Sequence, residues 1–566
     1  MKTILNYLNK LKLPHLIIIF ICIGYSKLII FGFFIEDDYS VFSLNNIKIA
    51  DALKNVCEWS SNRPLGCIYY SLISRIVPVF QVYFFLILAT YIFCLFLTLE
   101  IFKNYINHPI LKKIYILFSI FPFFSYTTLY SPAMQGVGIF SLFFWLLSLF
   151  FLKKFIENNK LYNFFVSKFF IFALLLTYES AIPLIGISIF FPLLYLKKKK
   201  IFFINILAYS LILITILYLQ KFIFPIFFDQ ELSRIKISII DYNKVIFLMS
   251  ANFILILNIF FQSLEFFILN IFNIIKNFDY IIILQIFLFT IISYYILNNS
   301  LILKLSHKKS KYFFIFLLMF LLVIILVCAM HAMSNTGLEF YRYNNRALVS
   351  LSYLLGLFFP IFLIFINIKH RSLFKYLSLI IIFILFVNFI SFQTNLINKK
   401  KEYLNLTQLI KSNLFLNNKD RKYKYILINS YNYSEKWMHY DNWHPYLATE
   451  IVNNLLFKSQ SNKTEVVNPN KRLYCNPFYR GSKIETKSGD QYFYNIIYVY
   501  NDKSYKYLDN LSYINMKKKL ADNFSCGKFD QNSFMSEDRN SRIANDDMFD
   551  SAFLILIKKI YFKYFF

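Results

Sequence analysis

Long uninterrupted runs of apolar residues are the feature that most limits how this chain can fold. Runs such as 14–35, 80–101 and 346–368 have about 17 to 25 residues, the length of helix that crosses a hydrocarbon layer of about 30 Å. Helices are the expected element, because lipid offers no hydrogen-bond partner to backbone amides. The sequence therefore predicts a polytopic α-helical membrane protein and excludes a soluble globular enzyme.

The charged residues lie mostly between the apolar runs. Of the 566 residues, 58% are hydrophobic and 16% charged, against about 25% charged residues in ordinary soluble domains. A formal net charge of +29 could indicate nucleic-acid binding, but the basic residues gather in short loops, as on the cytoplasmic side of membrane proteins. This placement favours the lipid bilayer over nucleic acid as the partner. The clusters are Lys2–Lys12, Lys103–Lys113, Lys153–Lys160, Lys197–Lys200, Lys304–Lys311 and Lys369–Lys375.

Placing all of these clusters in the cytoplasm predicts about eleven transmembrane helices. Their alternation puts the first loop 36–78, a segment at 220–280, residues 331–345 and everything after 394 on the outer face. Residues 1–393 then form a multi-pass transmembrane domain, and residues 394–566 a soluble domain outside the cytoplasm. The crossings are expected at 14–35, 80–101, 114–130, 133–152, 164–180, 181–196, 201–220, 281–299, 312–330, 346–368 and 376–393.

Residues 249–275 are also apolar enough to cross, and a twelfth crossing would move Lys304–Lys311 to the outer face. A stripe of polar residues on one face is typical of a helix that lies in the membrane interface. We therefore predict an interfacial helix here. The polar residues that recur at helical spacing are Asn258, Gln262, Glu265, Asn270 and Asn273.

The sequence after Lys399 changes to polar, Asn- and Tyr-rich stretches with short strand-like runs. A small α/β domain is predicted from the runs Tyr425–Asn429, Tyr492–Tyr500 and Phe553–Ile557. Its HYDNWH segment holds His439, Asp441 and His444, which match no established zinc spacing. An exposed aromatic loop is the favoured interpretation, and no metal site is predicted.

Four cysteines outside the apolar runs form two pairs along the sequence, Cys57 with Cys67 and Cys475 with Cys526. Disulfides persist in oxidising compartments, such as the space outside the cytoplasm. Because nearness in sequence does not establish bonding geometry, each pair is either a disulfide or two thiols.

Three carboxylates follow the first apolar run directly, in the sequence FFIEDDYSVF. They are Glu36, Asp37 and Asp38. A solvated helix end would explain a single acid, but three adjacent acids at a membrane boundary are costly and favour a functional site.

The same loop carries Trp59 and Arg63 in the sequence CEWSSNRPLG. An arginine guanidinium can bind the phosphate of an anionic lipid. The alternative is an interfacial tryptophan beside an arginine that extends its charge to the headgroups. The residues alone support both interpretations equally.

Three short motifs give the chain a resemblance to a known family. A crossing that ends in an acidic pair, a first outer loop with W…NRPL and a later TYES are similar to those of the Gtr-type O-antigen serotype-conversion glucosyltransferases, which belong to the GT-C superfamily. The likeness covers residues 1 to about 393. It implies a GT-C-like fold and a bacterial inner-membrane enzyme whose C-terminal domain lies on the periplasmic side.

The resemblance implies an inverting transfer of a hexose, expected to be glucose, from a polyprenyl-phosphate sugar to O-antigen, another surface glycan or a lipid-linked oligosaccharide. A first-loop carboxylate, matched here by Asp37 or Asp38, would deprotonate the acceptor hydroxyl. The base must lie within hydrogen-bond reach of that hydroxyl, while cations stabilise the departing phosphate. A divalent cation is the only cofactor candidate.

Two further polar segments are expected on the outer face. In HAMSNTGLEFYRYNNR, a positive loop opposes the inside bias of basic residues, although lipid contact would also explain it. In LLLTYESAIP, an ionisable residue stands where the fifth crossing ends, and a wet turn between two crossings explains it equally well. Candidates for the donor phosphate are Arg63, Arg342 and Arg346, and candidates for the sugar or acceptor are Glu36, Trp59, Tyr178, Glu179, His331 and Glu339.

Two other functions fit part of the pattern. A flippase or transporter of lipid-linked sugars would also be polytopic, but transporters tend to place ionisable residues at mid-membrane on broken helices, often in repeated halves. Here the acids and arginines gather at one face. An O-antigen polymerase or ligase would depend on outer-loop arginines such as Arg342 and Arg346, without a carboxylate pair. The first-loop acids favour the transferase.

Overall fold

The computed structural model divides the chain into two compact units. The helical unit holds the described helices up to residue 397, and the second unit holds four strands and the last turns of the helix that ends at Asn413. The described residues are 12–32, 48–59, 63–76, 80–123, 129, 137–177, 179–195, 199–223, 242–277, 279–299, 310–333, 348–365, 370–413, 424–429, 464–467, 494–499 and 505–508.

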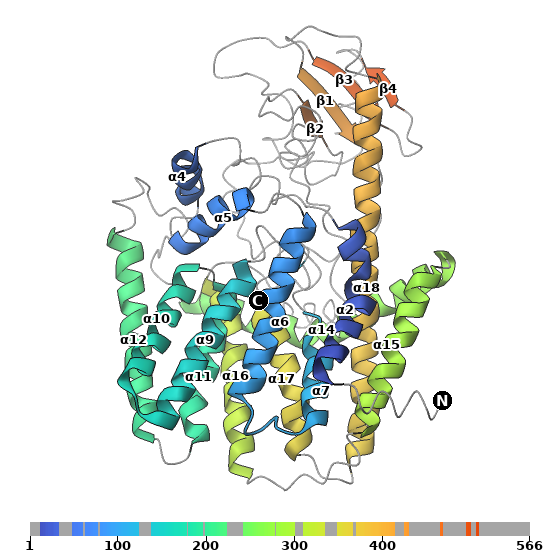
Figure 1. The fold of residues 1–566 in the computed structure, drawn as a ribbon. Helices are drawn as coiled ribbons and strands as arrows, with labels where there is room; N and C mark the ends of the chain where they lie inside the picture. Colours follow the sequence, from blue (N-terminus) through green and yellow to red (C-terminus); the bar gives the residue numbers. More distant parts are fainter. Residues whose placement is uncertain are drawn as a thin grey trace. The chain divides into compact units, whose positions relative to one another are not determined.

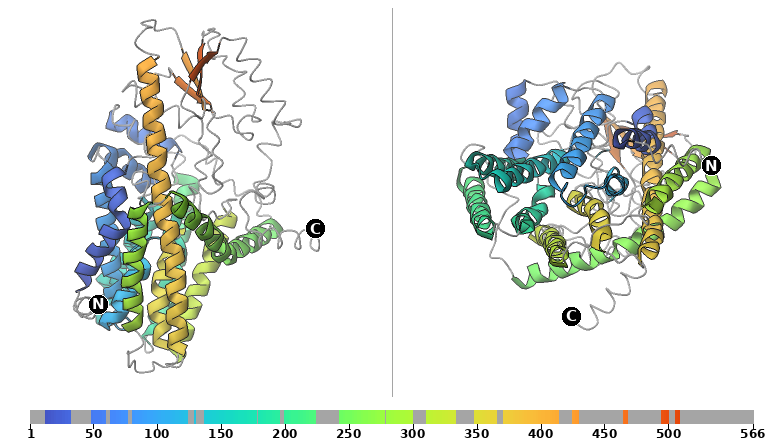
Figure 2. Two further views of the ribbon diagram at one scale, coloured as in Figure 1. Left: turned by 90° about the vertical axis from the view of Figure 1, so that its right-hand side faces the viewer. Right: turned by 60° about the horizontal axis from the view of Figure 1, so that its bottom comes forward.

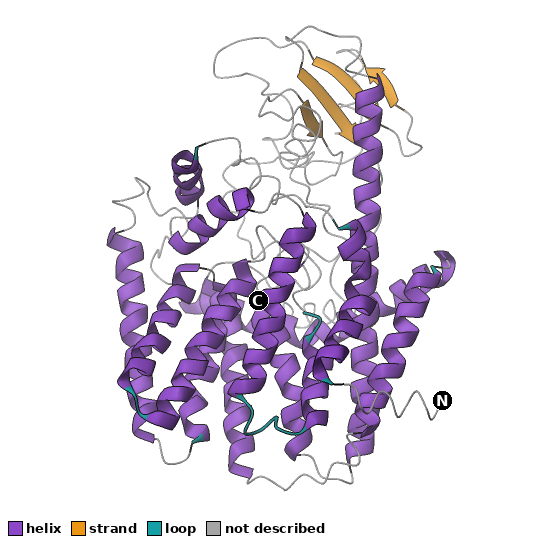
Figure 3. Ribbon diagram, in the orientation of Figure 1, coloured by secondary structure: helices purple, strands orange, loops and turns teal. Residues whose placement is uncertain are grey.

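The helical unit combines long and short helices; the α-helices are labelled in Figure 1, and all described helices are purple in Figure 3. Its long helices are α2 (Leu13–Phe31), α6 (Phe80–Ile101), α9 (Val137–Asn158), α12 (Lys199–Tyr218), α14 (Tyr242–Asn277), α15 (Tyr280–Asn299), α16 (Ser310–Met333) and α18 (Arg371–Asn413). Its shorter elements are α4 (Ile49–Trp59), α5 (Pro64–Ile76), α7 (Pro109–Ser119), α10 (Leu161–Thr177), η2 (Glu179–Leu184), α11 (Ile185–Phe190), η3 (Phe191–Leu194), η4 (Leu219–Ile223) and α17 (Val349–Phe365).

Seven described helices are long and apolar enough to cross a membrane, which is the composition of a membrane-embedded helical protein. Each coincides with a predicted crossing: Leu13–Phe31, Phe80–Ile101, Gly138–Asn158, Lys200–Tyr218, Tyr280–Asn299, Tyr312–Met330 and Arg371–Thr394. Three more predicted crossings coincide with the shorter apolar helices Leu161–Thr177, Ala181–Leu194 and Val349–Phe365. The crossing expected at 114–130 is matched only by α7, whose helix ends at Ser119, so the total of about eleven stays a prediction.

The stretch from Glu179 to Leu194 is a broken helix. Pro183 lies inside η2 and Pro192 near the start of η3. Proline has no backbone N–H and clashes with the preceding turn of an α-helix, so the backbone takes the tighter 3₁₀ form on both sides of the short α11. Because a 3₁₀-helix rises about 2.0 Å per residue, this stretch covers about 29 Å, close to the thickness of a bilayer core.

Helix α7 lies inside the helical unit. All of its residues from Ile114 to Ser119 are buried, and the ring of Phe118 stacks on that of Phe359 in α17. Gly356 of α17 leaves room for Ser119, because a Cβ added at Gly356 would stand 1.9 Å from Ser119 Oγ. The absence of a side chain at this glycine lets the two helices pack closely.

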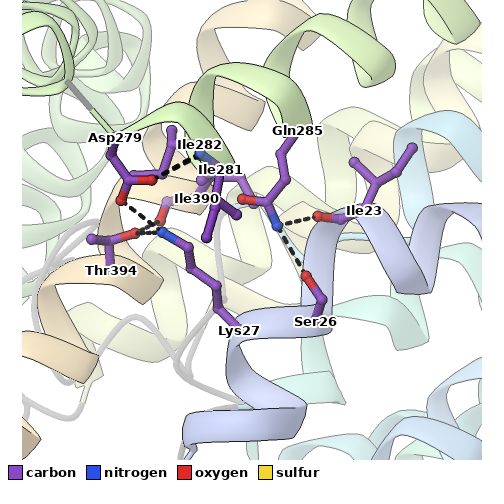
Figure 4. A network of polar contacts seen from close by, with 9 residues as sticks. All are labelled: Ile23, Ser26, Lys27, Asp279, Ile281, Ile282, Gln285, Ile390 and Thr394. Atoms are coloured by element: carbon purple, nitrogen blue, oxygen red, sulfur yellow. Dashed lines mark hydrogen bonds and ion pairs between the residues drawn. The ribbon is translucent and has the colours of Figure 1, made fainter.

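Three helices meet through a polar network at one end of the unit, which we call the Lys27 end (Figure 4). Lys27 Nζ of α2 lies 2.9 Å from Asp279 Oδ2, just before α15, and donates to Thr394 Oγ1 of α18 at 3.4 Å. Asp279 Oδ1 accepts hydrogen bonds from the backbone N–H groups of Ile281 and Ile282, each at 3.1 Å, and so caps α15.

The opposite end, which we call the Glu100 end, is fixed in the same way. Lys153 Nζ of α9 donates to the carbonyl of Glu100 in α6 at 2.5 Å. Lys375 Nζ, near the start of α18, donates to Asn298 Oδ1, near the end of α15, at 3.0 Å. Helices α15 and α18 therefore run in opposite directions between the two ends.

Helix α14 crosses the direction of the long helices, as Figure 2 shows. Asn252 donates to the carbonyl of Cys328, five residues before α16 ends, and Asn388, six residues before Thr394 in α18, donates to the carbonyl of Ser263. Both contacts are near the Lys27 end, although they are widely spaced along α14. Whether α14 lies in the membrane interface or makes a twelfth crossing stays a prediction.

The predicted polar stripe of α14 is wrong in one respect. Asn270 is buried and donates to Asn388 Oδ1 at 2.9 Å, whereas Asn273 is exposed. The two residues therefore do not share a solvated face, because the asparagine pair joins α14 to α18. The side chains of Asn258, Gln262 and Glu265 lie outside the described residues.

The second unit contains a four-stranded sheet in the order β2-β1-β3-β4. Strand β1 pairs in parallel with β2 and β3, and β3 pairs antiparallel with β4. The predicted runs 425–429 and 492–500 correspond to β1 and β3, while Phe553–Ile557 and the HYDNWH segment lie outside the described residues. The strands are β1 (Lys424–Asn429), β2 (Thr464–Val467), β3 (Tyr494–Val499) and β4 (Tyr505–Leu508).

Candidate functional site

The acidic triplet follows α2 in the sequence, and the last residues of α2 lie at the Lys27 end. Gly32, directly after α2, packs against the start of α6, because a Cβ added there would lie 2.1 Å from Phe80 Cε1. Glu36, Asp37 and Asp38 lie outside the described residues. They follow Gly32 by six residues at most, a reach of about 20 Å.

Arg63 stands immediately before α5, whose first residue, Pro64, suits the first turn of a helix. The Arg63 carbonyl accepts the N–H of Cys67 at 2.9 Å, and the side chain is half-buried. Helix α5 rests on the end of α10, because a Cβ added at Gly66 would be 3.0 Å from the carbonyl oxygen of Thr177. Trp59 is the last residue of α4, and its side chain lies outside the described residues.

Thr177 is at the Lys27 end because α10 runs away from the Glu100 end. A turn at Asn159, with a φ of 55°, joins α10 to the end of α9 that carries Lys153. Tyr178 lies outside the described residues, and Glu179 is described only as the first backbone residue of η2. The backbone of Arg63 therefore lies near the end of α10, which Tyr178 and Glu179 follow in the sequence.

Helix α16 brings the fourth candidate segment to the same end. The rings of Tyr312, near its start, and Tyr105, just after α6, lie 5.9 Å apart, so α16 begins at the Glu100 end. Its 24 residues rise about 36 Å and carry the backbone of His331 to the Lys27 end. The His331 side chain lies outside the described residues, as do Glu339 and the arginines at 342 and 346, which belong to the segment between α16 and α17.

A cavity among α6, α7, α9 and α17 is too small for a sugar. Tyrosine rings at positions 91, 115 and 353 line it. Tyr91 donates to the carbonyl of Ser119 at 2.5 Å, and Tyr353 shares a hydrogen bond of 3.1 Å with Thr98. Its volume of about 10 Å³ is room for about one water molecule. A sugar would therefore have to bind elsewhere than in this cavity.

A buried amine lies midway along α10. Lys168 Nζ donates to Asn205 Oδ1 of α12 and stands 3.8 Å from the ring centroid of Tyr209. Asn205 donates in turn to the carbonyl of Ser188 in the broken segment, at 2.9 Å, and Trp145 donates to Ser188 Oγ at 2.9 Å. Lys168 was not among the predicted site residues, although a lysine inside an apolar run is itself a signal of function.

Metal binding finds no support in the part of the chain that the structure describes. There, no three His, Cys, Asp or Glu side chains gather closely enough to hold an ion. His439, Asp441 and His444 lie outside that part.

No family model matches the chain, and comparisons with curated proteins and with solved structures found no similar protein.

Proposed function

We propose that the chain is a GT-C-like membrane glycosyltransferase that transfers a hexose, expected to be glucose, from a polyprenyl-phosphate sugar to O-antigen or another surface glycan. The observation that supports it is the convergence of α2, α5, η2 and α16, whose candidate segments all attach at the Lys27 end. A lipid-linked donor carries its phosphate at the membrane surface, so a site at one end of a bundle suits it. The Lys27 end is then the periplasmic face of a bacterial inner-membrane protein.

The reaction follows from the proposed residues. Asp37 or Asp38 takes the proton of the acceptor hydroxyl as its oxygen attacks the anomeric carbon from the face opposite the phosphate. The new C–O bond forms while the bond to the phosphate oxygen breaks, and that oxygen keeps the electron pair. Configuration is inverted and no covalent enzyme intermediate forms. Arg63, Arg342 and Arg346 stabilise the charge on the departing polyprenyl phosphate.

The remaining candidates hold the sugar or the acceptor. Carboxylates accept hydrogen bonds from sugar hydroxyls, and tyrosine and histidine can either donate or accept them. Glu179 begins a 3₁₀ segment that packs against α9, α10, α16 and α17, so its backbone is firmly held. The proposed contacts are Glu36, Trp59, Tyr178, Glu179, His331 and Glu339.

Substitution of the two first-loop aspartates tests the proposal. Asp37→Asn, Asp38→Asn and the double variant should leave the protein at normal level in the membrane, because asparagine keeps the shape. Mass spectrometry of the host glycan should show the loss of one hexose per modified unit in the variant that lacks the base. Asp51→Asn is the matched control, since it removes the same charge from the exposed face of α4 in the same loop. An unchanged glycan in the double variant would rule out the assignment.

A flippase or transporter is the second candidate, and Lys168 is the observation that favours it. This amine lies mid-helix and connects through Asn205 to the broken segment, which is where transporters place their binding groups. Purified protein in vesicles with a polyprenyl-phosphate hexose and the host glycan as acceptor separates the functions. A transferase consumes the donor and releases polyprenyl phosphate, a transporter moves the donor intact, and a polymerase or ligase leaves it unused.

A further inference from the structure

Helices α4 and α5 form a hairpin that encloses two cysteines. On α4, Ala52, Val56 and Cys57 are buried, whereas Asp51 and Lys54 are exposed, so the helix has one apolar face. Cys67, on α5, is also buried, with 0% of its surface exposed against 6% for Cys57. The two helices pack against each other. Both thiols therefore lie in the contact between the helices.

The two sulfur atoms are already neighbours. In the structure they are thiols, and a side-chain hydrogen bond joins them. Sulfurs within hydrogen-bond reach on two packed helices need only small side-chain rotations to approach the S–S bond length of about 2.05 Å. The sequence alone is compatible with a disulfide or with two thiols for this pair, and the contact shows that the two cysteines are close in space.

The hairpin also positions a candidate phosphate ligand. Cys67 donates its backbone N–H to the carbonyl of Arg63, so the cysteine and the arginine share the first turn of α5. Gly66, between them, fits against the carbonyl of Thr177 at the end of α10. Any bond that holds α4 against α5 therefore also limits how far Arg63 can move from α10.

We propose that Cys57 and Cys67 are oxidised to a disulfide that closes the α4–α5 hairpin and fixes the backbone of Arg63 at the end of α10. The compartment needed for oxidation rests on the proposed function, which puts the loop 36–78 on the outer face. The oxidant is a disulfide of another protein, in the chemical class of the thiol–disulfide exchange proteins.

The exchange balances in two steps. The Cys57 thiolate attacks one sulfur of the oxidant, whose S–S bond breaks and releases a thiol. The Cys67 thiolate then attacks the Cys57 sulfur, forming the new S–S bond and releasing the second thiol of the oxidant. Two electrons and two protons pass from the cysteines to the oxidant. Because α4 and α5 have only 11 and 13 residues and are not stable alone, the exchange takes place as the hairpin forms or opens.

In the closed hairpin the two thiols differ in their electrostatic surroundings. The hydrogen bond from the Cys67 thiol lowers the pKa of Cys57 despite its burial. The same hydrogen bond, followed by burial, raises the pKa of Cys67, and the nearby Arg63 charge opposes that rise. In the closed hairpin, Cys57 is therefore the more easily ionised of the two thiols.

The test uses the whole protein, prepared from membranes without reductant. The protein is unfolded in a denaturant that contains N-ethylmaleimide, which labels every free thiol. It is then digested with trypsin and examined by mass spectrometry. Trypsin cleaves poorly before proline, so the Arg63–Pro64 bond survives and one peptide, residues 55–75, carries both cysteines. We expect this peptide to be two hydrogens lighter than the dithiol and unlabelled, and to take two labels after reduction.

Controls in the same digest make each outcome decisive. Cys94 and Cys328, in α6 and α16, should carry maleimide, which shows that labelling was complete. In the Cys57→Ser variant, Cys67 should take one label. Amides in 55–75 should exchange with deuterium about tenfold slower or more in the oxidised protein than in the reduced protein. Two labels on the unreduced peptide, or a link from either cysteine to Cys475 or Cys526, would overturn the proposal.

The readout is a peptide mass and not a transfer rate. A disulfide without hexose transfer would leave this inference standing while the proposed function fails. Transfer with two labelled thiols would do the reverse.

Discussion

The ion pair between Lys27 and Asp279 gives a prediction with a worked magnitude. At 2.9 Å and an effective dielectric constant of about 20, the attraction is about 6 kcal/mol before desolvation. The side chains are 13% and 29% exposed, so both lose hydration on folding, which reduces the net coupling to about 1–3 kcal/mol. Asp279→Asn removes the charge but keeps an oxygen that can cap α15, since asparagine is also a good N-cap.

A double-mutant cycle measures this coupling directly. We expect Asp279→Asn to lower the free energy of unfolding by about 2 kcal/mol, because Lys27 is left largely buried without its counter-charge. Lys27→Met should cost about 1–2 kcal/mol, and the double variant less than the sum of the single costs by about 1–3 kcal/mol. The assay is denaturant unfolding of the purified protein in mixed micelles. Costs that add to within about 0.5 kcal/mol would refute an energetic link between α2 and α15.

The pH dependence of the same pair has a definite sign. Burial raises the pKa of the Asp279 carboxyl, but the hydrogen bonds from Lys27 and the backbone of Ile282 and Ile281 outweigh it and leave the pKa below its ordinary value of 3.8. A lowered carboxyl pKa stabilises the fold above the ordinary value, and the stability is lost as pH falls through the lowered pKa. The difference between wild type and Asp279→Asn should therefore be constant from pH 5 to 8 and shrink below about pH 4.

Three further substitutions test packing and the buried amine. Gly356→Ala should lower the free energy of unfolding by about 1–3 kcal/mol, because its Cβ would meet Ser119, whereas the control Gly186→Ala meets only flexible leucine side chains and should cost less in the same micelle assay. Lys168→Met should leave the melting temperature unchanged or higher, since it removes a buried charge, and should leave hexose transfer intact; loss of transport in vesicles would instead favour the transporter. Gly66→Ala should lower the rate of hexose transfer by more than the loss of folded protein explains, because the added methyl group pushes α5 away from α10.

The long helices could be predicted from sequence because the cause is local. An apolar run of sufficient length satisfies its backbone only as a helix in lipid, and this holds whatever the run packs against. The breaks were harder to predict. Pro183 and Pro192 are visible in the sequence, but the 3₁₀ geometry that they impose was not foreseen. The end of α7 at Ser119 has a local signal, because Pro122 follows the C-cap Ile120 by two residues and helices usually end before a proline, but the predicted crossing at 114–130 ran through it.

The polar contacts inside the helical unit were missed because they join residues far apart in the chain. A lysine inside an apolar run, at position 27 or 168, indicates a free-energy cost of burying its charge. The sequence does not show which acceptor offsets that cost. Asp279 is 252 residues from Lys27, and Asn270 pairs with Asn388 across 118 residues. The candidate site was easier to anticipate in outline, since acids, arginines and a TYES motif stand at the ends of apolar runs. The convergence of their supporting helices needed the structure.

The network around Lys27 sets an order on biosynthesis. Its two acceptors lie 252 and 367 residues further along, so at ribosomal speeds of about 5–20 residues per second the first helix waits roughly 13–50 s for the carboxylate and longer for the hydroxyl. Until then the lysine, a few residues from the helix terminus, can stretch its ammonium into the headgroup water. Assembly of the bundle therefore closes late, when its earliest and latest helices meet. In a nascent chain halted before Asp279, the Lys27 amine would still lack its carboxylate partner.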